Sequence, residues 1–233
     1  MPLMIRIAKR PRPIPIDANG DESAAETARL RDAEALALLN VLSARGKFIV
    51  NGEGITVAVV DTGVRHSHSL FHRCIGKSNI VASINLTEDN FGVCYDAWDG
   101  AGHGTHVAGI VLQVAPAAKL AIVKALPSGD GTEPHFELID RSLRWVLHHQ
   151  REYHISVVCL SLGDDQVHRA PPTADEYNTT ATLIAQLTAN DIAVVAAAGN
   201  HYAKNPTLGM CFPAILPDCI SVGAVYDHDS GEP

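Results

Sequence analysis

A histidine between two glycines is the feature of this 233-residue sequence that most directly suggests chemistry. His103 lies between Gly102 and Gly104, and the small residues Val107-Ala108-Gly109 follow it. Glycine permits a close approach of backbone or ligand, and small residues let a helix that starts here pack tightly against a sheet. A histidine at such a helix start can act as a general base near neutral pH, provided that other segments supply an acid to orient it and a nucleophile to serve.

The elements that must position this histidine follow from the hydrophobic pattern. Short apolar runs rich in β-branched residues and flanked by turn residues predict strands, at residues 55–60, 80–84, 120–123, 155–160, 192–197 and 220–225. Between them, apolar stripes at helical spacing predict helices near 136–147 and 177–187, the second preceded by a possible capping box of Thr173 and Glu176. Strands alternating with helices predict an α/β fold of three layers, a mainly parallel sheet with helices on both faces.

Composition bounds the remaining possibilities. With 46% hydrophobic residues and a formal charge of -8, the chain can bury one sizeable core, and it lacks the basic surface that nucleic acid or an anionic membrane would select. We expect an N-terminal arm and helix over residues 1–48, with Gly46 ending the helix, and one domain over 49–233. No apolar stretch is long enough for a signal peptide or a membrane span, so we expect a cytoplasmic protein. Five cysteines without metal-type spacing do not indicate a disulfide framework.

Polar and small residues follow several of the predicted strands directly. Asp61 ends the first run, Ser161-Leu162-Gly163 follows the fourth, and Gly199-Asn200 follows the fifth. In open parallel sheets ligands bind beyond the carboxyl ends of the strands. We therefore expect an acid, the base His103, a glycine-bearing edge and an amide donor at one rim of the sheet.

These segments, in this order and spacing, resemble the successive signatures of the subtilisin-like serine proteases. The resemblance covers roughly residues 50–226 and is carried by four motifs: Val57-Ala58-Val59-Val60-Asp61-Thr62-Gly63, His103-Gly104-Thr105-His106-Val107-Ala108-Gly109, Leu160-Ser161-Leu162-Gly163 and Ala196-Ala197-Ala198-Gly199-Asn200. The resemblance implies a subtilisin-like fold and a serine endopeptidase that acts on a peptide or protein substrate.

The same resemblance implies a role for each motif. Asp61 would orient His103, which would act as the general base, and Asn200 would donate a hydrogen bond to the oxyanion. The substrate would add as a strand along Ser161-Leu162-Gly163. Leu162 and residues 196–198 would line the first specificity pocket, which predicts a mainly apolar side chain before the scissile bond. The predicted substrate-binding residues are Ser161, Leu162, Gly163, Ala197, Ala198 and Gly199.

One element of the family pattern is missing from the sequence. The nucleophile motif Gly-Thr-Ser-x-Ala does not occur, Ser221 falls inside a predicted strand, and Ser230 lies in a polar tail. We therefore expect the fold to be incomplete at the C-terminus, with the nucleophilic serine on missing residues or on a second chain. The isolated chain should then be inactive.

Two further expectations concern metals. The segment after the His103 helix is too short for the calcium loop of the family, and Leu70 stands where calcium-binding members place an aspartate. His66, His68, His72 and Cys74 are close in sequence, but we interpret them as residues of a surface loop rather than metal ligands. We expect neither a metal nor another cofactor.

Alternative interpretations remain open for the individual residues and for the whole chain. Asp61 and Asn200 are also ordinary turn residues, and Leu162 is also an ordinary core residue. The chain as a whole would alternatively be a catalytically inactive peptide-binding or regulatory subunit with a protease-like groove. A Gly-Thr-Ser-x-Ala segment downstream or in a partner would favour the protease.

Overall fold

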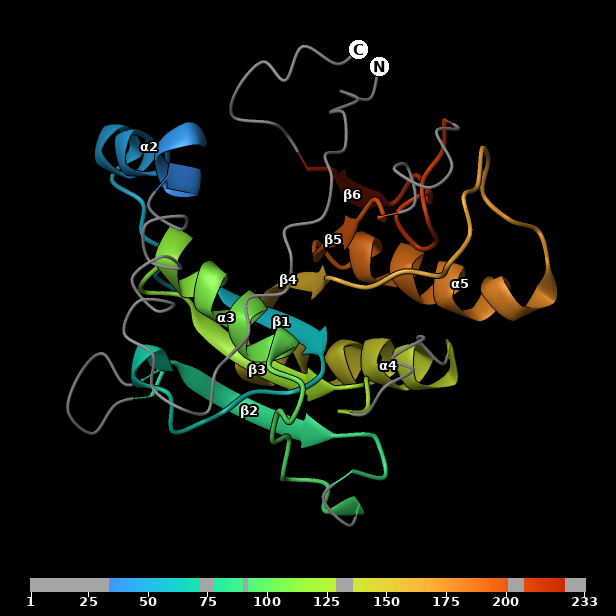
Figure 1. Ribbon diagram of the computed structural model, residues 1–233, viewed down its shortest axis with the longest axis horizontal. Helices are drawn as coiled ribbons and strands as arrows, with labels where there is room; N and C mark the ends of the chain where they lie inside the picture. The colour runs from blue at the N-terminus through green and yellow to red at the C-terminus, as the bar shows by residue number, and fades with distance from the viewer. Residues whose placement is uncertain (1–33, 72–77, 90–91, 129–135, 201–207, 225–233) are drawn as a thin grey trace.

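The computed structural model describes residues 34–71, 78–89, 92–128, 136–200 and 208–224. Its centre is a six-stranded sheet in the order β2-β3-β1-β4-β5-β6, and every neighbouring pair is parallel (Figure 1). The strands are β1 (Thr56–Asp61), β2 (Ile80–Asn85), β3 (Lys119–Lys124), β4 (Ile155–Leu160), β5 (Ala193–Ala197) and β6 (Cys219–Val222). This confirms the predicted α/β fold with a mainly parallel sheet, and each strand lies within a few residues of its prediction.

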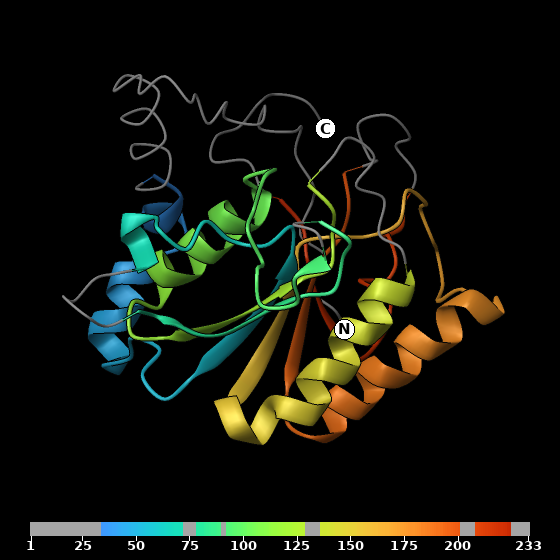
Figure 2. The same cartoon turned by 90° about the horizontal axis from the view of Figure 1, so that it is seen from below.

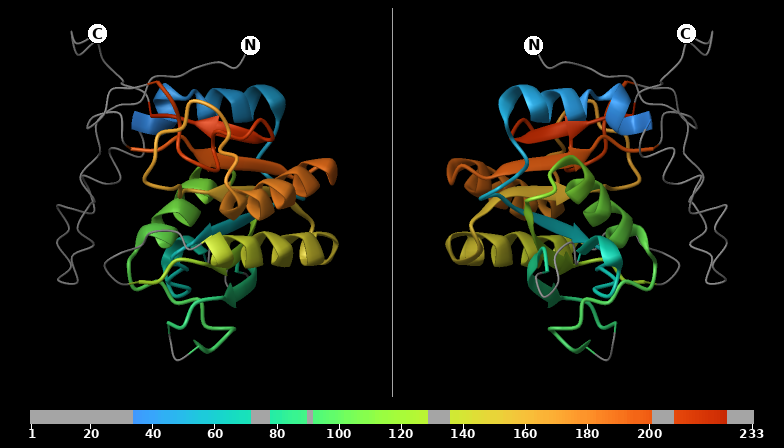
Figure 3. Two further views of the ribbon diagram at one scale, coloured as in Figure 1. Left: turned by 90° about the vertical axis from the view of Figure 1, so that its right-hand side faces the viewer. Right: turned by 90° about the vertical axis from the view of Figure 1, so that its left-hand side faces the viewer.

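Helices cover both faces of this sheet. Helix α3 (His103–Val114) packs on one face, and α4 (Phe136–Tyr153) and α5 (Asp175–Ala189) pack side by side on the other (Figures 2 and 3). The side chains of β1 alternate between the two layers, as the pleat of a strand requires. Val57 and Val59 join the core under α3, whereas Ala58 and Val60 join the core under α4 and α5. The middle of a strand buried on both faces is almost entirely apolar, and residues 57–60 of β1 were visible in the sequence for that reason.

Two details of the predicted helices are wrong. Thr173 does not cap α5, because the helix begins at Asp175 after an extended Ala174 and has no side-chain cap. Gly46 does not end the N-terminal helix: residues 34–38 are helical, Asn40 interrupts them with a left-handed backbone, and α2 (Val41–Phe48) continues through Gly46. The predicted arm and the first part of that helix lie outside the described residues.

The N-terminal region exposes several large apolar side chains, among them Leu42, Phe48 and Ile49. A 3-10 turn, η1 (Ser69–Phe71), follows the loop after β1 and buries Phe71 beneath α3. Within the described part of the chain, no helix has the length and apolar character needed to cross a membrane.

Candidate active site

The acid and the base predicted from sequence lie in contact. Asp61 is the last residue of β1 and continues the row of Val57 and Val59, so its side chain lies on the α3 face, where His103 is the first residue of the helix. His103 Nδ1 and Asp61 Oδ1 are 2.7 Å apart. The carboxylate is 1% exposed and the imidazole 51% exposed. The acid is therefore shielded from water while the base remains accessible to a reactant.

The buried carboxylate controls the protonation of the imidazole. The hydrogen bond to Asp61 raises the pKa of His103 above its ordinary value, partial desolvation opposes this, and the charges of Asp61 and Asp99 add to the increase. Asp61 Oδ1 also accepts a hydrogen bond from the Thr62 amide at 2.7 Å. Among the described residues, Oδ2 of Asp61 is the buried side-chain polar atom that has no hydrogen-bond partner. The geometry places the carboxylate to fix Nδ1–H as donor and to stabilise the imidazolium, which leaves Nε2 to accept a proton.

A second buried aspartate fixes the start of α3. Asp99 is 0% exposed and accepts hydrogen bonds from the amides of Ala101, Gly102 and Thr105 and from the Thr105 hydroxyl. Thr62 Oγ1 also donates to Asp99, at 2.9 Å. Asp99 thus supplies the acceptors that the first turn of a helix lacks, and it ties that turn to the residue after Asp61. Asp99 was not among the residues predicted from the sequence, although an aspartate four residues before His103 was a usable signal.

The predicted substrate edge forms where β4 and β5 end side by side. Ser161-Leu162-Gly163 follows β4, and Ala197 ends β5 just before Ala198 and Gly199. Cys211 packs between the two segments: its Sγ donates to the Ala197 carbonyl at 3.0 Å, and a Cβ on Gly163 would overlap this sulfur. A thiol of the neighbouring 208–216 segment therefore joins the two parts of the expected edge, a contact that the sequence analysis did not foresee.

The remaining members of the predicted site differ in their surroundings. Gly199 has a φ of 107°, a conformation that favours glycine, and the following Asn200 is exposed. Leu162 is buried in the core under α4 and α5, as its alternative interpretation as a core residue supposes. The roles of Asn200 and of the substrate edge stay predictions.

Neither the serines considered from the sequence nor the described metal-ligand candidates form a second reactive site in the described part of the chain. Ser221 lies within β6 and donates its hydroxyl to the Ala214 carbonyl, in keeping with its interpretation as a strand residue, and Ser230 lies outside the described residues. The described histidines, cysteines and acidic residues form no group of three or more that could bind a metal. His72 and Cys74 also lie outside the described part.

Comparison with known proteins decides the family. The model of the Subtilase family matches residues 52–232, well over half of the chain. This chain belongs to the subtilase family. The resemblance read from the four motifs is therefore confirmed. In the described part of this subtilase Asp61 and His103 are in contact, and their catalytic roles stay predictions.

The match to this subtilase chain covers only part of each relative's length. Subtilisin E of Bacillus subtilis (strain 168) is 32% identical over 184 residues, which cover 75% of this chain and 42% of the relative. The major intracellular serine protease of the same organism is 31% identical over 186 residues, covering 76% and 52%. The chain thus spans about half the length of these relatives.

Solved structures agree on the fold. The CspB protease of Clostridium perfringens superposes with a TM-score of 0.57 at 26% identity, over 69% of this chain and 39% of that protein. A lanthipeptide protease gives a TM-score of 0.61 at 17% identity, over 84% and 56%, and this likeness concerns the fold alone.

Proposed function

We propose that this chain supplies the acid, the base and the oxyanion donor of a subtilisin-like serine endopeptidase, and that the nucleophilic serine belongs to residues outside this sequence or to another chain. The observation that carries the proposal is the 2.7 Å contact between His103 Nδ1 and Asp61 Oδ1, made by a buried acid and an accessible imidazole. A base of this kind needs a partner hydroxyl, and no serine of the recognised nucleophile motif occurs in the sequence.

The chemistry would follow the pattern of an oriented histidine. His103 Nε2 takes the proton of the serine hydroxyl as the serine oxygen attacks the scissile carbonyl, and Asp61 stabilises the imidazolium that forms. The tetrahedral intermediate carries its negative charge on the former carbonyl oxygen, to which Asn200 would donate a hydrogen bond. His103 then returns the proton to the leaving amine. The acyl-enzyme is hydrolysed by water in the same two steps.

The proposed substrate is an extended peptide bound along Ser161-Leu162-Gly163. Strand addition suits this position because the segment continues β4 beyond the last paired residues of the sheet. Cys211 occupies the space between Gly163 and Gly199, and a Cβ on Gly199 would lie 3.3 Å from its sulfur. We therefore expect a small apolar side chain to fit between these segments better than a large one.

The exposed strand β6 supports the idea of a missing or separate segment. Among the described strands β6 lies at one end of the sheet, and its side chains Ile220 and Val222, on the same face as Val59 of β1, are 55% and 50% exposed. Exposed apolar side chains on one face of a sheet favour a further segment that packs over that face. The segment that carries the serine is the partner that we propose for this face of β6.

A serine-directed fluorophosphonate probe tests the proposal. The 233-residue chain alone should show no specific labelling. The same chain joined to, or mixed with, its natural segment bearing Gly-Thr-Ser-x-Ala should be labelled at that serine, and His103→Ala should abolish the labelling in a protein that still folds. Specific labelling of the isolated chain would contradict the proposal.

The alternative of a peptide-binding subunit makes a different prediction for the same experiment. If no serine-bearing segment restores labelling while unmodified peptides bind the chain in a fluorescence anisotropy titration, the groove is used for binding alone and the protease proposal is wrong.

A further inference from the structure

A buried lysine lies directly beside the proposed catalytic acid. Lys124 is the last residue of β3, and its Cα is the register partner of Asp61 at the end of β1. It continues the row of Leu120 and Ile122, which face α3, and it is 0% exposed. Because removing an ammonium group from water is costly, its position calls for specific partners.

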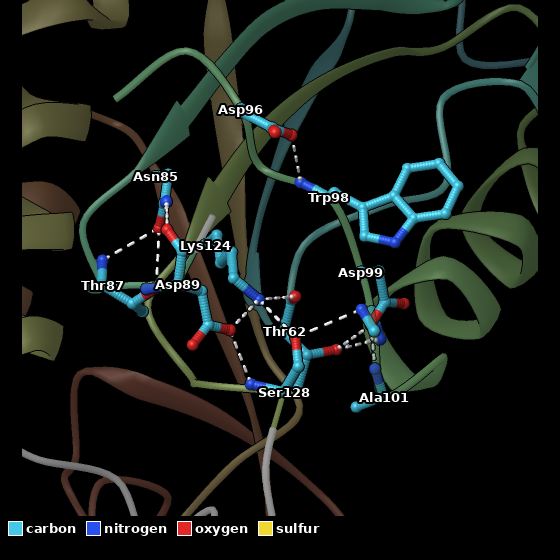
Figure 4. Close-up of polar contacts among 12 residues, drawn as sticks. Thr62, Asn85, Thr87, Asp89, Asp96, Trp98, Asp99, Ala101, Lys124 and Ser128 are labelled. Carbon is cyan, nitrogen blue, oxygen red and sulfur yellow. Dashed lines mark hydrogen bonds and ion pairs between the residues drawn. The ribbon is translucent and has the colours of Figure 1, made fainter. Parts of the chain in front are cut away.

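The partners of this ammonium come from three different loops. Lys124 Nζ donates to the Thr62 carbonyl at 2.6 Å and to Ser128 Oγ at 2.9 Å, and it lies 3.0 Å from Asp89 Oδ2 (Figure 4). These residues follow β1, β3 and β2 respectively. A lysine ammonium has three N–H donors, so all three are used.

Asp89 and Ser128, two of the partners of Lys124, are also hydrogen-bonded to each other. Asp89 Oδ2 also accepts the Ser128 amide at 2.8 Å. Although partial desolvation raises the pKa of Asp89, the hydrogen bonds from Lys124 and Ser128 outweigh it and hold the pKa below its ordinary value. Asp89 is therefore ionised at neutral pH, and it balances the charge of the lysine.

Thr62 connects the Lys124 ammonium to the start of α3, where His103 lies. Its carbonyl accepts from Lys124, its hydroxyl donates to Asp99 at 2.9 Å, and the same hydroxyl accepts the Gly104 amide at 2.9 Å. Thr62 is thus connected to the lysine at its main chain and to the start of α3 at its side chain. Since Thr62 directly follows Asp61 and Gly104 directly follows His103, this residue fixes the spacing of the acid and the base.

We propose that Lys124 is a positioning residue: it anchors the Thr62 carbonyl to Asp89 and Ser128 and thereby keeps Asp61 within hydrogen-bond distance of His103. The catalytic meaning of this inference rests on the proposed function. The contact that Lys124 maintains can nevertheless be measured in the chain without any proteolysis.

A purely electrostatic role for Lys124 predicts the opposite result. The charged groups that act on His103 are Asp61 and Asp99. Removal of a nearby cation would strengthen the effect of these carboxylates and raise the pKa of the imidazole. Loss of positioning would lengthen the hydrogen bond to Asp61 and lower that pKa. The sign of the change therefore separates the two roles.

The experiment is an NMR titration of the His103 ring in the 233-residue chain. Lys124→Met should lower the pKa of His103 relative to the wild type and weaken the low-field signal of its Nδ1 proton. Ser128→Ala changes no charge; it removes one acceptor of the Lys124 ammonium, together with the hydrogen bond that the same hydroxyl accepts from the Gly100 amide, and it should shift the pKa in the same direction by less. This second variant decides the matter if Lys124→Met does not fold.

Thr180→Val is the matched control. Thr180 is 0% exposed and donates its hydroxyl to Asp140, which joins α5 to α4 on the opposite face of the sheet. The variant Thr180→Val should lower the melting temperature of the chain and leave the pKa of His103 unchanged. An unchanged or raised pKa in both Lys124→Met and Ser128→Ala would overturn the positioning role. Failure of the proposed protease function would appear separately, as absent fluorophosphonate labelling of the serine-bearing protein.

Discussion

Replacing Gly104 by alanine tests how closely α3 must approach the proposed acid. A Cβ at this position would overlap the Gly63 carbonyl oxygen and lie 3.1 Å from both Cβ and Oδ1 of Asp61. Gly63 cannot move away easily, because its own α-carbon packs against the Ala97 carbonyl and its φ is 102°. The start of α3 must therefore move outward, carrying His103 away from Asp61.

Two opposing contributions determine how much Gly104→Ala changes the free energy of unfolding. Alanine is favoured over glycine in a helix by about 1 kcal/mol. Overpacking a well-packed site against rigid backbone costs about 1–3 kcal/mol. The difference predicts that Gly104→Ala lowers the free energy of unfolding by about 0–2 kcal/mol, which corresponds to a decrease of up to about 8 °C in melting temperature for a chain of this size.

The same substitution elsewhere in α3 provides the control. At Gly109 the nearest obstacle to a new Cβ is the Leu70 Cδ1 atom at 3.2 Å, the end of a flexible side chain. Gly109→Ala should therefore raise the melting temperature, by about 1–4 °C. Thermal unfolding followed by circular dichroism would measure the melting temperatures of both variants. An NMR titration would measure the pKa of His103, which should fall only in Gly104→Ala. If Gly104→Ala is as stable as Gly109→Ala and keeps the wild-type pKa, the close-packing argument is wrong.

Two other predictions need no serine nucleophile. Because Asp61 raises the pKa of His103 in the folded state, the contribution of this pair to stability is complete below the unfolded value of about 6.5 and is lost as pH rises through the folded pKa. Urea denaturation at pH 5.5 and 8.5 should show this loss in the wild type, and a loss of equal size in Asp61→Asn would refute it. Burial raises the pKa of Cys211 and of Cys219 to about 12, which leaves about one thiolate in 10⁴ at pH 8. Native alkylation followed by peptide mapping should therefore modify the exposed Cys94 before Cys211 and Cys219, and equally rapid modification of Cys211 would contradict the structure.

The sequence revealed those features whose signal is local. The strands were predictable because the middle of a strand buried on both faces is almost entirely apolar, as in residues 57–60 of β1. The contact of Asp61 with His103 was expected because a strand end and a helix start carry them to one rim. The left-handed Asn40 that interrupts the N-terminal helix had no comparable signal, since tertiary context can override helix propensity.

The supporting residues of the site were not predictable in the same way. Lys124 ends an apolar run, where a lysine ordinarily extends into solvent. Its burial depends on Asp89 and Ser128, which two other loops bring to the same place. Asp99 likewise gains its function from the folding of the Thr62 loop against α3. Such contacts between loops of different strands leave no periodic pattern in the chain.

The alternation of side chains along β1 has a consequence for how this family member can change during evolution. Asp61 lies on the α3 face only because the side chains of the odd-numbered residues of β1 point to that face. The main chain of β1 is paired on both sides, to β3 and to β4. Inserting or deleting one codon within residues 57–60 would turn the carboxylate toward α4 and turn apolar side chains toward the imidazole. Substitutions that conserve volume are tolerable in this strand, whereas changes in its length should be eliminated by selection.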